Sequence, residues 1–60
     1  MPQLADLQRM KTTTIYAWLC TISTSRYFGY NMQRLREKIS KNKARQHLVE
    51  LILLNDRDKS

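Results

Sequence analysis

The fold is decided by the segment from residue 31 to residue 54, which reads NMQRLREKISKNKARQHLVELILL. It lacks glycine and proline, and its apolar residues recur at the three- and four-residue spacing of a helix. Two apolar stripes follow one another, first Met32, Leu35 and Ile39, then Ala44, Leu48, Leu51 and Ile52. At about 100° per residue, the second stripe is rotated by well over a quarter turn from the first. We therefore predict a break or bend near residues 40–43.

Residues that favour helix caps flank these two predicted helices. Asn31 is a good N-cap for the first, and either Ser40 or Asn42 can cap the second. We expect the second helix to end near Leu54 and the following NDRDKS to be frayed. The prediction is one helical domain over residues 1–55 with a frayed tail over residues 56–60.

Upstream of residue 31 the sequence predicts further helices rather than strands, because Pro2 and Gly29 are its only proline and glycine. Pro2 suits the first turn of a helix whose apolar side consists of Leu4, Leu7 and Met10. A second helix is expected from Thr12 or Thr13 to Ile22, with a stripe of Ile15, Trp18, Leu19 and Ile22. The sequence thus predicts an all-α domain of three to four helices.

Residues 23–31, STSRYFGYN, form the one segment expected to be irregular. Serine and threonine weaken a helix there, and Gly29 permits a turn with positive φ. Tyr27, Phe28 and Tyr30 could form a small wing with Arg26 or pack over the core. We expect at least two of these three aromatic rings to pack.

A chain of 60 residues buries only a modest core, so we expect a disulfide, a metal or a partner chain to add to its stability. Cys20 is the only cysteine, which excludes an internal disulfide, and Cys20 with His47 makes a poor zinc-ligand set. Apolar residues cover nearly the whole circumference of a helix over residues 48–54. We therefore predict that the fold is completed by dimerisation or by a larger partner, through an interface made of Leu48, Leu51, Ile52 and Leu54.

The net charge of +6 is concentrated between residues 34 and 45, which hold six cations and a single anion, Glu37. On a continuous helix, four of the cations share one face: Arg34, Lys38, Lys41 and Arg45. Such a stripe would be about 16 Å long and could follow several phosphates of a duplex. The alternatives are a solvated face without a partner, an acidic protein, or a lipid surface, which the narrow apolar face disfavours.

The segment from residue 4 to residue 19, LADLQRMKTTTIYAWL, has the apolar spacing of a helix-turn-helix. Its part TIYAWL resembles the second-helix signature of excisionase and MerR-type regulators, roughly Thr-Val-Tyr-x-Trp-Ile. The resemblance implies that this helix docks in the major groove while a following wing touches the backbone. It places four residues toward DNA, namely Lys11, Thr12, Thr13 and Tyr16, assigns Arg26 to the wing, and turns Ile15, Trp18 and Leu19 inward. Arg9, where the turn often has glycine, departs from the pattern.

No set of catalytic residues is recognisable, because His47 is the only histidine and has no nucleophile or orienting group near it in sequence. We expect a protein that is not an enzyme and that uses no metal, no cofactor and no small-molecule substrate. The absence of a signal-like N-terminus and of an apolar run long enough to span a bilayer, with a lone thiol, predicts a cytoplasmic location and no membrane partner.

These observations together predict a small basic protein that binds double-stranded DNA, as a transcriptional regulator or a recombination accessory factor. One alternative is a helical adaptor or inhibitor that docks on a larger protein through its apolar C-terminal helix. Another is an RNA-binding component, in which Tyr27, Phe28 and Tyr30 stack on bases beside Arg26. The adaptor should bind its partner tightly even at high salt, whereas the affinity for either nucleic acid should fall steeply as salt rises.

Overall fold

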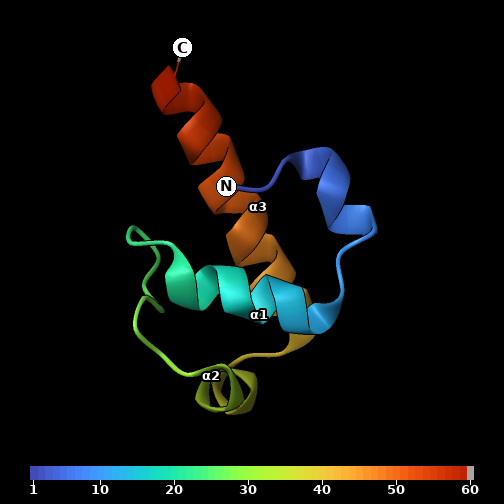
Figure 1. The fold of residues 1–60 in the computed structure, drawn as a ribbon, viewed down its shortest axis with the longest axis vertical. Coiled ribbons are helices and arrows are strands. Elements are labelled where there is room, and N and C mark those ends of the chain that lie inside the picture. The colour runs from blue at the N-terminus through green and yellow to red at the C-terminus, as the bar shows by residue number, and fades with distance from the viewer. Residues whose placement is uncertain (60) are drawn as a thin grey trace.

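Three α-helices and one short 3₁₀ helix make up the residues that the computed structural model describes, 1–59, with Lys59 described by its backbone alone. In chain order they are η1 (Leu4–Gln8), α1 (Thr12–Thr21), α2 (Met32–Lys38) and α3 (Lys41–Lys59). No strand occurs in this part of the chain. The predicted all-α class is confirmed, and Figure 1 shows the arrangement.

Helix α1 lies at the centre and packs against both α2 and α3. It crosses the N-terminal half of α3, with α2 seen nearly end-on below it (Figure 1). The core where the three helices meet consists of fully buried aliphatic side chains, Ile15 and Leu19 from α1, Leu35 from α2, and Ala44, Leu48 and Ile52 from α3. The predicted apolar stripes therefore do face one common core.

The predicted break between α2 and α3 is confirmed at Ile39, whose backbone is extended with φ −136° and ψ 150°. Asn31 caps α2, because its Oδ1 accepts a hydrogen bond from the Arg34 backbone N–H at 2.9 Å. Ser40 rather than Asn42 caps α3, since the Lys43 backbone N–H donates to its Oγ at 3.3 Å. The turn lets two stripes that point in different directions reach the same core.

The N-terminal segment differs from its prediction, because residues 4–8 form a 3₁₀ helix and Pro2 precedes it. Its backbone hydrogen bonds join residues three apart, as between the Met10 N–H and the Leu7 carbonyl at 3.2 Å. So short a piece cannot supply the hydrogen bonds that nucleate an α-helix. η1 packs against α3, with Leu7 buried and Leu4 left 40% exposed.

The end of α3 was also predicted wrongly, since the helix continues past Leu54 to Lys59. Ser60 lies outside the described residues. The apolar part of α3 is covered by the same chain on the side that α1 and η1 contact, while Leu53 and Leu54 stay about half exposed on the other side. Leu48 and Ile52 have no exposed surface, and Leu51 is half-buried. Of the four predicted interface residues, only Leu54 is largely exposed.

Residues 22–31 form a loop of successive turns, as predicted, and its shape depends on Gly29. Gly29 has φ +88°, a conformation that side-chain-bearing residues rarely adopt. Its backbone N–H donates to the carbonyl of Cys20 at 3.1 Å, which ties the loop to the end of α1. Tyr27 is buried and Tyr30 packs against the core, whereas Phe28 is 58% exposed. Two of the three aromatic rings pack, as expected.

Candidate nucleic-acid interface

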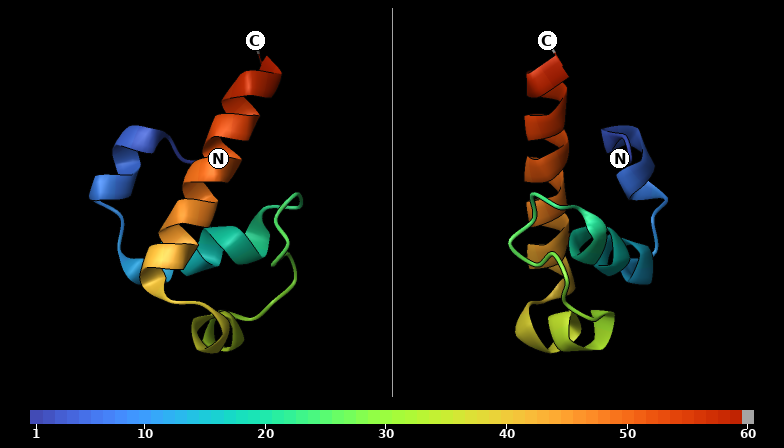
Figure 2. Two further views of the ribbon diagram at one scale, coloured as in Figure 1. Left: turned by 180° about the vertical axis from the view of Figure 1, so that it is seen from behind. Right: turned by 60° about the vertical axis from the view of Figure 1, so that its left-hand side comes forward.

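The cations between residues 34 and 45 gather where α2 ends and α3 begins, and we call this region the basic corner: Arg34, Arg36, Lys38, Lys41, Lys43 and Arg45. All six side chains are exposed. Both views of Figure 2 place α2 and the first turns of α3 at the same end of the molecule, opposite the C-terminal end of α3. With Glu37, the region carries +5 of the net charge of +6. The charge of the chain is therefore polarised toward one end.

The predicted single stripe of four cations does not exist as one helix face, because the break at Ile39 separates its two halves. Arg34 and Lys38 lie one turn apart on α2, while Lys41 and Arg45 lie one turn apart at the start of α3. The stripe was predicted for one continuous helix, and the break excludes that arrangement. The four cations lie around the junction of two helices instead of along one helix face.

Tyr30 contacts two of the three cations of α2, Arg34 and Lys38. The Arg34 guanidinium lies 5.8 Å and the Lys38 ammonium 5.3 Å from the centre of its ring, and the Lys38 Nζ also donates to its hydroxyl at 3.1 Å. Cations over an aromatic face are attracted by the ring quadrupole. The position of Tyr30 directly before the N-cap Asn31 is a local signal for packing on the first turn of α2.

Tyr16 was predicted to face DNA, and the structure corrects this. Its side chain is only 3% exposed, and its hydroxyl donates to the backbone carbonyl of Ile39 at 2.9 Å. The Arg36 guanidinium lies 5.8 Å from the ring centre on the outer side. Tyr16 therefore joins α1 to the α2–α3 break and supports the basic corner from beneath.

The remaining residues of the predicted DNA-reading helix have mixed positions. Lys11 and Thr13 are exposed at the start of α1, and Thr12 is half-buried. Arg26 is exposed in the loop, where no wing of strands forms within the described residues. Ile15 and Leu19 are buried as predicted, while Trp18 is only partly buried. Of the four residues predicted to face DNA from this region, only Lys11 and Thr13 are exposed.

The start of α3 has an electrostatic arrangement that favours an anion. The N-terminal end of a helix carries positive partial charge, which acidic residues normally offset. The first turn of α3 contains none, and Lys41 and Lys43 occupy it instead. Their charges add to that of the helix end. The last turn of α2 differs, because Arg36 and Lys38 there lie at the negative end of their own helix.

A hollow of about 510 Å³ opens beside the basic corner, between the loop and the start of α2. Its lining residues are Phe28, Gly29, Tyr30, Asn31 and Arg34. Arg34 belongs to both the hollow and the basic corner, so the two features are continuous. The exposed ring of Phe28 is the apolar part of this lining.

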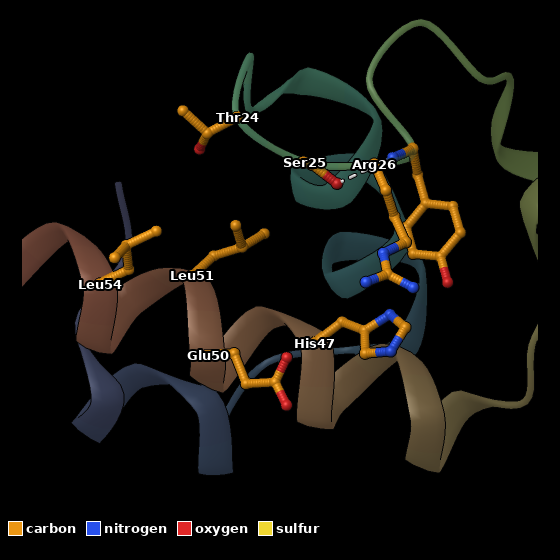
Figure 3. Close-up of a pocket in the computed structure, with 8 residues that line it drawn as sticks. Thr24, Ser25, Arg26, His47, Glu50, Leu51 and Leu54 are labelled. Atoms are coloured by element: carbon orange, nitrogen blue, oxygen red, sulfur yellow. Dashed lines mark hydrogen bonds between the residues drawn. The ribbon is translucent and has the colours of Figure 1, made fainter.

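A second cavity, of about 360 Å³, lies between the loop and α3 and is shown in Figure 3. Arg26 reaches toward His47 and Glu50, while Leu51 and Leu54 form an apolar end. The opposite charges of Arg26 and Glu50 offset each other, so the cavity offers no net attraction to a polyanion. It is a separate feature from the basic corner.

His47 and Cys20 have structural environments. The His47 ring stacks on Tyr27, with ring centres 5.4 Å apart and planes 16° apart, and its buried Nδ1 has no hydrogen-bond partner. Tyr27 in turn meets Tyr30 edge to face at 5.8 Å. Burial raises the pKa of the half-buried Cys20 thiol above its ordinary value. Neither residue has a nucleophile–base pair around it among the described contacts.

Comparison with protein-family models, with curated proteins and with solved structures finds no match to this chain. Within the described residues, no helix is long and apolar enough to cross a bilayer. The same part of the chain contains no group of three or more side chains of the kinds that ligate metals. Arguments about function therefore rest on the geometry of the basic corner and its surroundings.

Proposed function

We propose that this chain binds nucleic acid, with the basic corner contacting the phosphate backbone. The observation that carries the proposal is the placement of six exposed cations and one anion around a single helix junction. A charge spread evenly over the surface would serve solubility, whereas a concentrated patch attracts a polyanion. Phosphates are the polyanion that such patches most often contact.

The start of α3 adds a second argument. Lys41 and Lys43 at the positive end of a helix destabilise it by roughly 0.3–1 kcal/mol each when no anion is bound. Neither side chain makes an ion pair within the described residues. A phosphate bound there would remove this repulsion and would meet the backbone N–H groups of Lys41 and Asn42, since Ser40 already caps that of Lys43. The repulsion that destabilises the free protein is relieved in the complex, and the relief adds to the binding free energy.

Double-stranded DNA, a regulatory or recombination role and the absence of catalysis stay predictions, as does the cytoplasmic location. Phosphate contacts fix the position of a protein on nucleic acid but do not read sequence. The first turn of α1 offers Lys11 and Thr13 for such reading, and Tyr16 is unavailable because it is buried. The proposal is therefore a backbone-binding protein whose specificity comes from neighbouring surfaces.

The test is fluorescence anisotropy of a labelled random-sequence duplex and a matched single strand, titrated at several salt concentrations. The corner variant is Lys41→Gln with Lys43→Gln, and the charge-matched control is Arg9→Gln with Arg26→Gln. Each lost phosphate contact lowers the slope of log affinity against log salt by about 0.9 on a duplex and about 0.7 on a single strand. We expect the corner variant to lower the slope by roughly two such contacts and the control to leave it nearly unchanged.

Two results would overturn the proposal. One is the absence of salt-dependent binding to either nucleic acid at low salt. The other is an equal loss of affinity in the corner and control variants, which would mean that the corner cations contribute no more than cations elsewhere on the chain. Because Arg26 is also the residue assigned to the wing, the control separates the corner from the wing as the contact surface.

A further inference from the structure

The hollow at Phe28 contains an aromatic ring that the fold does not use. Phe28 is 58% exposed, the largest exposed fraction among the large apolar side chains of the described residues. Its neighbours Tyr27 and Tyr30 are packed, and together they account for the aromatic contacts of the loop. Exposing a phenyl ring to water gains nothing for folding. The ring is available to a ligand.

The backbone beside Phe28 keeps the space around the ring open. A Cβ at Gly29 would meet no atom within 4 Å, so nothing in the chain fills the room above this residue. The resulting volume, about 510 Å³, lies within the range of ordinary small-ligand sites. Phe28 is one of the residues that line this space, so a flat ring such as a nucleobase is the kind of ligand that its phenyl ring would suit.

The polar groups at the rim of the hollow suit a base attached to a phosphate. Asn31 uses its Oδ1 to cap α2, which leaves its exposed Nδ2 group able to donate to a base carbonyl. On the next turn, Arg34 and Lys38 are already positioned over Tyr30. A strand whose base enters the hollow would bring its neighbouring phosphates onto these two cations.

We propose that the hollow formed by Phe28, Asn31 and Arg34 binds an unpaired nucleobase, so that the preferred ligand is a single-stranded segment of nucleic acid. This inference rests on the proposed function of the basic corner. Stacking on Phe28 needs an open base face, and in a duplex both faces are covered by neighbouring bases. An aromatic ring beside a row of cations is the usual combination for binding single strands. RNA and DNA strands share this chemistry, and they differ in the 2′-hydroxyl and in the C5 methyl group that distinguishes thymine from uracil.

The experiment compares three labelled strands of about 12 nucleotides, within the site sizes of single-strand binders. They are oligouridylate, oligothymidylate and an abasic strand with the same number of phosphates. The variant is Phe28→Ala, and the matched control is Leu53→Ala, which removes a side chain of similar exposure near the opposite end of the molecule. Circular dichroism and urea unfolding check that both variants keep the wild-type fold.

We expect Phe28→Ala to weaken binding of the base-bearing strands about five- to a hundredfold. Binding of the abasic strand and of a random duplex should stay within twofold of wild type, and Leu53→Ala should change nothing. A 2-aminopurine base in the strand should lose its fluorescence quenching in the Phe28→Ala complex. A stronger effect on one of the two base-bearing strands would identify RNA or DNA as the source of the base.

The inference and the proposed function fail in different ways. If wild-type protein binds no strand and no duplex, the basic corner is not a nucleic-acid site and both proposals are overturned. If it binds with a salt slope that depends on Lys41 and Lys43, but Phe28→Ala changes nothing or weakens the abasic strand equally, only the base-binding hollow is overturned. That result would leave contact with a protein partner as the alternative role for the exposed Phe28 side chain.

Discussion

Replacing Tyr16 by phenylalanine gives the sharpest test of the fold at the basic corner. The substitution keeps the ring under Arg36 and removes only the hydroxyl that donates to the Ile39 carbonyl at 2.9 Å. That hydrogen bond joins α1 to the break between α2 and α3. Its loss leaves a partly buried carbonyl without this donor. The structure therefore predicts a loss of stability, whereas the resemblance to helix-turn-helix regulators predicts a loss of DNA contact.

The expected loss can be worked out from ordinary magnitudes. A net hydrogen bond contributes about 0.5–1.5 kcal/mol, and the partial burial of this one places it at roughly 1 kcal/mol. A small core supplies about 3–5 kcal/mol in total, so the variant loses a fifth to a third of its stability. With a urea m-value of about 1 kcal/mol/M, the unfolding midpoint falls by about 1 M at constant m. The melting temperature falls by about 4–8 °C.

Urea and thermal unfolding followed by circular dichroism measure the stability, and strand binding by anisotropy measures the function. Tyr30→Phe is the matched control, because its hydroxyl makes only an exposed contact with Lys38 and should contribute under about 0.5 kcal/mol. We expect Tyr16→Phe to unfold earlier yet bind nucleic acid within twofold of wild type. Unchanged stability with a tenfold weaker affinity would refute this reasoning and place Tyr16 against the ligand.

Three further outcomes follow from single contacts. Asn31→Ala should lower stability by about 1 kcal/mol through the lost cap of α2, measured by urea unfolding, while Asn42→Ala, which caps nothing, should not. Leu35→Ala should cost about 2–5 kcal/mol and leave the chain largely unfolded by circular dichroism, against under about 0.5 kcal/mol for exposed Leu53→Ala. The raised pKa of Cys20 means that its thiol stays protonated to higher pH in the folded than in the unfolded chain. Alkylation near pH 8 should therefore be slow in buffer and fast in urea, and equal rates would contradict the burial.

The helices around the break were predictable because their signals are local. The rotation between the stripe of Leu35 and the stripe of Leu48 follows from residue spacing alone, and a break is the simplest way to bring both to one core. Asn31 caps α2 by a contact with a residue only three positions away. Such features need no knowledge of the tertiary structure, so the sequence indicated them correctly.

The errors concern contacts between residues distant in sequence. Tyr16 and Ile39 are 23 residues apart, and no spacing rule connects a tyrosine hydroxyl to the carbonyl at a helix break. Likewise, η1 folds back onto α3, which made the predicted dimer interface at Leu48 and Ile52 unnecessary. Apolar content alone could not tell whether α3 is covered by the same chain or by another one.

The arrangement of the corner cations is the part of the candidate site that only the structure could supply, and it bears directly on affinity. Free arginine and lysine side chains lose about 1.5–2 kcal/mol of conformational entropy each when a ligand immobilises them. Tyr30 and Tyr16 already hold Arg34, Lys38 and Arg36 near their rings. Cations ordered in advance lose less on binding, so they contribute more to affinity than the same charges on an open helix. The two tyrosines therefore support binding by ordering these cations, and the hydrogen bond from Tyr16 to the Ile39 carbonyl fixes the end of α2 near the Tyr16 ring.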